Sequence, residues 1–111
     1  MKFKYGAANN PVLRTLMQRL NDYRGFGRGE AIRYAKFVKE WDKKIVEMQK
    51  EMKTYLEDAG KKFAEMSNEE KDDFMKPYFE REFEIDMKPF RIGNDLKLSP
   101  NEIEVAKDLL A

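Results

Sequence analysis

The chain has 111 residues, which is enough for a single domain (1–111) with a modest hydrophobic core. Charged residues make up 39% and hydrophobic residues 41%, a balance that indicates a folded, soluble protein rather than a disordered one. No apolar run approaches a membrane span and no signal peptide is evident, so we expect a cytoplasmic protein without membrane contact. Cysteine and histidine are absent, which excludes disulfides and the commonest zinc ligands, so no metal or cofactor is expected.

The net charge of +1 conceals two halves of opposite sign. Residues 1–44 carry 11 Lys or Arg and 4 Asp or Glu, for a net charge of +7. Residues 45–111 carry 11 Lys or Arg and 17 Asp or Glu, for a net charge of −6. Such halves can attract each other within one chain or between two copies, and the basic half can face a phosphate-bearing partner.

The first segment, residues 1–29, is expected to hold a short helix and a turn. Asn10 is a favourable N-cap and Pro11 suits the first helical position, so we place the start of the helix there. The helix should end near Tyr23, before a turn that reads RGFGRG (24–29) and holds three glycines able to adopt positive φ. The apolar face of this helix consists of Leu13, Leu16, Met17, Leu20 and Tyr23.

A long helix is expected over residues 30–60, with Gly60 as its C-terminal cap. It would measure roughly 45 Å, twice the length of the first helix. Apolar residues recur along it in alternating steps of three and four, which is a heptad pattern and needs a partner along its whole length. The interaction seam consists of Tyr34, Val38, Trp41, Ile45, Met48, Met52 and Tyr55.

The seam allows two interpretations, an oligomer interface between copies of the chain or a bundle seam within one chain. The short first helix reaches only the first half of the seam, so the second half must pack on the C-terminal third or on another chain. The bulk of Tyr34, Trp41 and Tyr55 and the extra width from Phe37 favour a bundle over a regular two-stranded coiled coil. The sequence leaves both interpretations open.

The third segment, residues 61–111, is expected to be helical at both ends. Ser67 and Ser99 each stand three residues before a glutamate, which predicts two capping boxes and two helix starts. Between them, alternating apolar residues around a turn at 93–95 indicate a small β-hairpin. We expect the aromatic residues here to be core that closes the far end of the long helix: Phe74, Tyr78, Phe79, Phe83 and Phe90. The fold class is therefore mainly α, a helical hairpin with one long heptad-patterned helix, a C-terminal helical segment and a small β-hairpin.

The glycine/arginine turn and the helix that follows form a candidate anion-binding or nucleotide-binding site. Glycine-rich backbone, arginines and a helix N-terminus can together hold a phosphate, and Phe26 could stack on a base. The spacing matches neither a P-loop nor a dinucleotide fingerprint, so an interhelix turn with a solvated basic face is the preferred interpretation. The residues of this candidate strip are Arg24, Phe26, Arg28, Arg33, Lys36, Lys39 and Lys43.

No set of residues indicates a reaction. The only serines, Ser67 and Ser99, are explained as helix caps, and the carboxylates alternate with lysines as they do on solvated helix faces. Without a nucleophile, a base and an orienting group in one pattern, we expect a protein that is not an enzyme.

Several stretches resemble a family of small uncharacterised phage proteins. They are LMQRLNDY (16–23) with the turn after it, IRYAKFVK (32–39), KEMKTYLE (50–57), FEIDMKPF (83–90) and LSPNEI (98–103). The resemblance implies a phage origin and, because small phage proteins often act as assembly factors or inhibitors of host machinery, a role of that kind.

The residues and the resemblance together predict a non-catalytic interaction protein. We expect it to be oligomeric, with itself as one partner, and to act on another protein. For a phage-encoded protein in the host cytoplasm, that protein would be a host defence or replication component, which implies an inhibitor or anti-defence role, or a virion component. The alternative is a binder of nucleic acid or a nucleotide through the turn and the basic strip.

Overall fold

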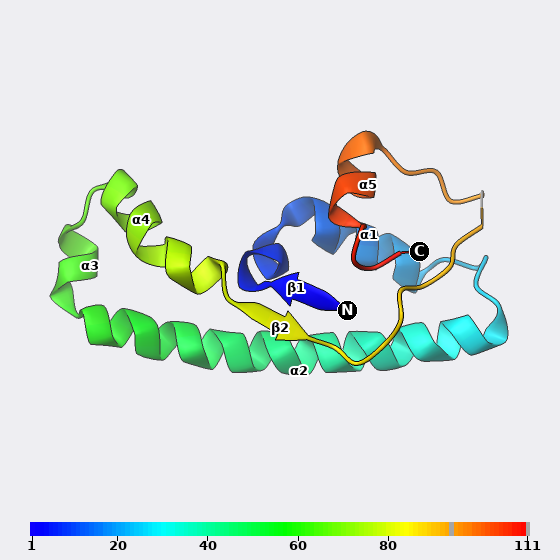
Figure 1. Cartoon of the computed structure of the whole chain (residues 1–111), viewed down its shortest axis with the longest axis horizontal. Coiled ribbons are helices and arrows are strands. Elements are labelled where there is room, and N and C mark those ends of the chain that lie inside the picture. The colour runs from blue at the N-terminus through cyan, green and yellow to red at the C-terminus, as the bar shows by residue number, and fades with distance from the viewer. Residues whose placement is uncertain (94, 111) are drawn as a thin grey trace.

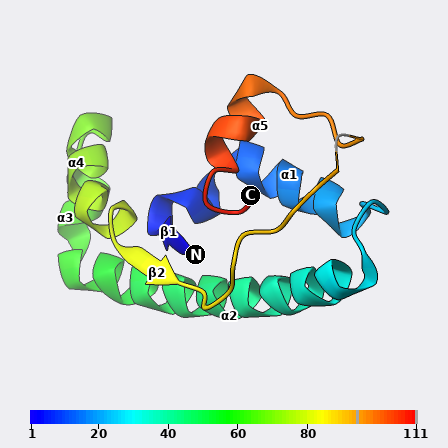
Figure 2. The same ribbon diagram turned by 45° about the vertical axis from the view of Figure 1, so that its right-hand side comes forward.

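The protein is an elongated body built on one long helix. The computed structural model describes residues 1–93 and 95–110 and measures 51 × 27 × 19 Å. Helix α2 (Arg28–Ala59) runs along the whole body, and the other elements lie along one side of it in both views (Figures 1 and 2). The predicted mainly α fold with one long helix is confirmed.

The helix starts follow the capping signals in the sequence. The Asn10 side chain accepts a hydrogen bond from the Val12 N–H at 2.9 Å, at the start of α1 (Pro11–Asn21). Ser67 and Ser99 form the two predicted capping boxes, at α4 (Asn68–Phe79) and α5 (Pro100–Val105). Each box satisfies amide groups that the first helical turn leaves unpaired. The remaining helices are a 3₁₀ helix, η1 (Tyr5–Asn9), and a short α3 (Lys61–Glu65).

The β structure differs from the predicted hairpin. Strand β1 (Lys2–Lys4) pairs antiparallel with β2 (Glu82–Glu84), so two segments almost eighty residues apart form the sheet. Phe3 lies opposite Phe83, and both rings are buried towards α2. The alternation around Phe83 did indicate a strand, but its partner is the N-terminus and not residues 96–98. Residue 94, within the predicted turn, lies outside the described residues.

Aromatic side chains form the centre of the core above the middle of α2. The Phe3 ring lies 5.1 Å from Trp41 and 5.6 Å from Phe83, measured between ring centroids. Phe90 lies 5.5 Å from Phe37 and is fully buried with it. The prediction that Phe83 and Phe90 close the far end of α2 is therefore wrong: Phe83 covers its middle and Phe90 its N-terminal half. Phe74 and Tyr78 do pack at the far end, against Tyr55.

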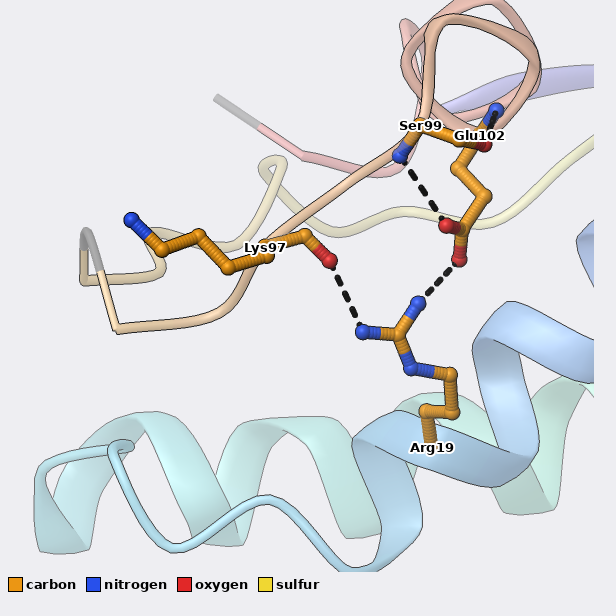
Figure 3. A network of polar contacts seen from close by, with 4 residues as sticks. All are labelled: Arg19, Lys97, Ser99 and Glu102. Carbon is orange, nitrogen blue, oxygen red and sulfur yellow. Dashed lines mark hydrogen bonds and ion pairs between the residues drawn. The ribbon is translucent and has the colours of Figure 1, made fainter.

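Helix α5 is tied to α1 by the network around Arg19 (Figure 3). The Arg19 guanidinium pairs with the Glu102 carboxylate and donates a second hydrogen bond, of 2.8 Å, to the Lys97 carbonyl oxygen. Glu102 also accepts from the Ser99 N–H at 3.0 Å, so one carboxylate caps α5 and holds it on α1. The chain after β2 is fixed to the same region, because the Phe90 N–H donates to the Leu109 carbonyl at 2.9 Å.

Candidate functional site

Three of the seven predicted seam residues are buried within the chain. Tyr34, Trp41 and Met48 are each less than 8% exposed. The Tyr34 hydroxyl donates to the Met17 carbonyl at 3.0 Å, and burial raises the pKa of this hydroxyl. Further along α2, the Tyr78 hydroxyl donates a hydrogen bond to the Met48 carbonyl oxygen at 2.6 Å. Along these positions the seam closes on the chain itself.

The other four seam residues, Val38, Ile45, Met52 and Tyr55, are only half-buried. Tyr55 is held by α4, because its ring lies 4.7 Å from that of Phe74 and its hydroxyl donates to the Phe74 carbonyl at 2.7 Å. The sequence-based expectation that the C-terminal third covers the end of the seam is confirmed there. Ile45 and Met52 lie on either side of Met48 along α2, and both stay partly exposed.

The middle of the seam forms the floor of an open groove of about 440 Å³. Its apolar floor consists of four seam residues of α2 and Tyr78 of α4, and its far wall is made by η1 and the start of α1. Of the polar side chains on the rim, Arg14 and Asp42 carry opposite charges, so the rim has no net charge. The lining consists of Ala8, Asn9, Arg14, Trp41, Asp42, Ile45, Met48, Gln49, Met52 and Tyr78.

The sequence identified the floor of this groove but not its walls. The heptad pattern includes Trp41, Ile45, Met48 and Met52, whereas Ala8, Asn9 and Arg14 belong to segments far from α2 in the sequence. No local pattern signals a wall of this kind, since it depends on how η1 docks between β1 and α1.

The glycine/arginine turn connects α1 to α2. Two of the predicted anion-binding residues, Phe26 in the turn and Arg33 on α2, face inwards. Phe26 packs on Tyr34 at 5.5 Å, so its face is not available to stack on a base. None of its glycines has positive φ; in the described chain only Gly60 does. Gly25 is required for close packing instead, because a methyl group there would lie 2.1 Å from the Tyr23 hydroxyl oxygen.

Arg33, the second inward-facing residue, joins the turn to the C-terminal segment. It pairs with Glu30 at 2.5 Å, donates to the Lys88 carbonyl at 2.8 Å and lies 5.0 Å above the Phe90 ring. The Arg33 bond and a bond from the Arg91 N–H lower the pKa of Glu30. Arg33 is thus already satisfied by protein groups, and the negative charge of Glu30 opposes a bound anion.

The remaining residues of the predicted basic strip are exposed. Arg24, Arg28, Lys36 and Lys39 make no ion pair within the described residues, and Lys43 reaches Glu40 at 3.3 Å. The strip as predicted therefore divides into an inward pair, Phe26 and Arg33, and five solvent-facing cations.

A second open groove, of about 500 Å³, lies between β1 and α5. Lys2 and Lys4 border it on one side, and Glu82, Glu104 and Asp108 are the acidic residues of its lining. Charges of both signs above an apolar floor define no particular ligand. No pattern in the sequence indicated this groove.

The serines cap helices, and the carboxylates form no metal-binding cluster, in the part of the chain that the structure describes. Ser67 and Ser99 both serve as caps, as predicted. No group of three or more carboxylates comes together there in a way that could hold a metal ion.

Fold and groove together define a small helical protein with an open groove beside one long helix. Comparisons with known protein families, characterised proteins and solved structures found no significant match. The resemblance to small phage proteins stays a prediction from the sequence. Among the described helices, none combines the length and the apolar character needed to cross a membrane.

Proposed function

We propose that this protein is a non-catalytic binding protein whose α2 groove accepts a helix of a partner protein. The observation that carries the proposal is the floor of the groove, where Ile45 and Met52 are only partly buried beside the buried Trp41 and Met48. Residues in a heptad pattern suit a helical partner better than any other, because a helix presents its own side chains at the same spacing.

The dimensions of the groove support a helical occupant. Trp41 and Met52 are eleven helical steps apart, or about 16 Å, which corresponds to three turns of a partner helix. Two methionines on the floor can adapt to the shape of the inserted side chains. The rim has no net charge, so we expect apolar anchors spaced at i, i+4 and i+7 to provide most of the affinity.

The partner is either another protein or a second copy of this chain. If the resemblance to phage proteins holds, the other protein is a host defence or replication component or a virion component, and the groove acts by blocking or by assembly. A second copy would instead place one of its own helices in the groove. In both cases the same floor residues make the contact.

Replacing Met52 by lysine tests the proposal. Met52 is only partly buried, so a lysine there places a charge in the groove. Met48 is buried, so a lysine at that position would also disturb the core. Ile103→Lys is the matched control, since Ile103 is 57% exposed and lies on α5, outside the groove. The molar mass from light scattering measures self-association. For a foreign partner, the measurement is the affinity of each variant for a protein that the wild type has captured and that has then been purified.

We expect Met52→Lys to weaken self-association or partner binding at least tenfold and Ile103→Lys to leave both unchanged. Wild type and Met52→Lys that share the same molar mass and the same partner affinity would contradict the proposal.

A further inference from the structure

The face of α2 that points away from the rest of the molecule is rich in exposed cations, with Ile32, Ala35 and Val46 between them. Both views show this face free of other elements over its length (Figures 1 and 2). Because successive helical residues turn by about 100°, six basic side chains fall within an arc of about 100° centred opposite the core. We call them the outer stripe: Arg28, Lys36, Lys39, Lys43, Lys50 and Lys53, all exposed.

The outer stripe differs from the strip expected from the sequence. Phe26 and Arg33 are absent from it because they face inwards. Lys50 and Lys53 extend it into the acidic half of the sequence, where net charge alone concealed them. The stripe runs about 38 Å without a carboxylate in the same arc, and Asp42 and Glu47 border it on the two sides.

We propose that the outer stripe binds the phosphate backbone of a double-stranded nucleic acid. Five of the six cations make no ion pair within the described residues, and Lys43, paired with Glu40, still exposes 70% of its side chain. A row of mostly unpaired cations complements the charge of a duplex, which carries one phosphate per about 1.7 Å of axis. The length of the stripe corresponds to about one duplex turn.

Other anionic partners fit the stripe less well. Single strands are held by stacking on aromatic rings, and every aromatic residue of α2 lies on the core side: Tyr34, Phe37, Trp41 and Tyr55. A membrane surface needs a broad apolar face, whereas Ile32 and Val46 are the only large apolar residues exposed on α2 in the described structure. Duplex phosphates require neither feature.

The contact is expected to be independent of base sequence, because the lysines reach phosphates and α2 presents no amide or aromatic cluster for reading bases. If all six cations meet phosphates, log K should fall against log salt with a slope of about −5. This inference does not depend on the proposed groove function, because the groove and the outer stripe lie on different faces of α2.

Two triple variants of equal charge test the inference on the full chain. The stripe variant is Lys36→Gln, Lys39→Gln, Lys50→Gln. The control is Lys62→Gln, Lys76→Gln, Lys97→Gln, which removes three equally exposed cations elsewhere. Fluorescence anisotropy with a mixed-sequence DNA duplex of about 20 base pairs, between about 50 and 200 mM salt, gives affinity and salt slope.

We expect the stripe variant to lose about three units of the salt slope and the control to keep the wild-type slope. The inference is overturned if the wild-type protein does not bind the duplex at about 50 mM salt. It is also overturned if both triple variants lose affinity equally, or if anionic lipid vesicles are bound and the duplex is not.

Discussion

Phe90 anchors the C-terminal segment to α2, so truncating its side chain should strongly reduce the free energy of unfolding. The ring is fully buried, 5.4 Å from Tyr34 and 5.5 Å from Phe37, and Arg33 lies 5.0 Å above it. Residues 85–93 and 95–98 hold no helix or strand, so this ring replaces the contacts that regular structure would make.

Phe90→Ala should reduce the free energy of unfolding by about 3–5 kcal/mol, the range for truncating a buried phenylalanine. A domain of this size is stable by only about 5–15 kcal/mol, so the loss is a large fraction of the total. Phe90→Leu keeps most of the apolar volume but loses the ring pairs, and should cost about 1–2 kcal/mol.

Urea unfolding followed by Trp41 fluorescence measures both variants. Trp41 is the only tryptophan and is 6% exposed within the same core, so its emission reports the loss of the core packing. Ile103→Ala is the control and should stay within about 0.5 kcal/mol of wild type. A cost below about 1 kcal/mol for Phe90→Ala would refute the view that this ring fixes residues 85–98 to α2.

Two further predictions concern backbone and charge. Gly60 has φ +58° and ψ −142°, a region almost confined to glycine, so Gly60→Ala should destabilise by about 1–3 kcal/mol. Gly29→Ala, in open space within α2, should instead stabilise by about 0.4–1 kcal/mol; equal effects in thermal unfolding would contradict this. Hydrogen bonds from the Ser99 N–H and then Arg19 lower the pKa of Glu102, so their stabilisation is present above the ordinary value of 4.5 and is lost as pH falls through the lower, folded-state pKa. In urea titrations at several pH values, the free energy of unfolding should fall less with decreasing pH for Glu102→Gln than for wild type.

The capping signals and the heptad pattern predicted the helices well because both act locally. Asn10, Ser67 and Ser99 each contact an amide two or three residues away, so the sequence contains the whole interaction. α2 begins at Arg28 and ends at Ala59, within two residues of the predicted bounds. α1 ends at Asn21, two residues before the predicted end.

The sheet and the site were harder to predict because they depend on contacts between distant segments. Three-residue strands carry too little alternation to identify a partner, and Phe3 and Phe83, which lie opposite each other, are eighty residues apart in the sequence. Phe26 and Arg33 look like ligand-binding residues in the sequence. In the structure, however, Phe26 stacks on Tyr34, and Arg33 forms an ion pair with Glu30. Composition shows which side chains could bind a ligand, but it does not show which of them already contact other residues of the same chain.

The groove follows from the unequal lengths of the helices. α2 has 32 residues and is about 48 Å long, whereas α1 and α4 have 11 and 12 residues and measure about 16 and 18 Å. Because α1 contacts α2 at Tyr34 and α4 contacts it from Met48 to Tyr55, Ile45 lies between the two contacts and stays partly exposed. Phe3 and Phe83 of the short sheet cover Trp41 but do not reach Met52. A seam longer than the helices that cover it thus leaves apolar residues for a partner, and because folding uses only the inner face of α2, the lysines of its outer face remain free.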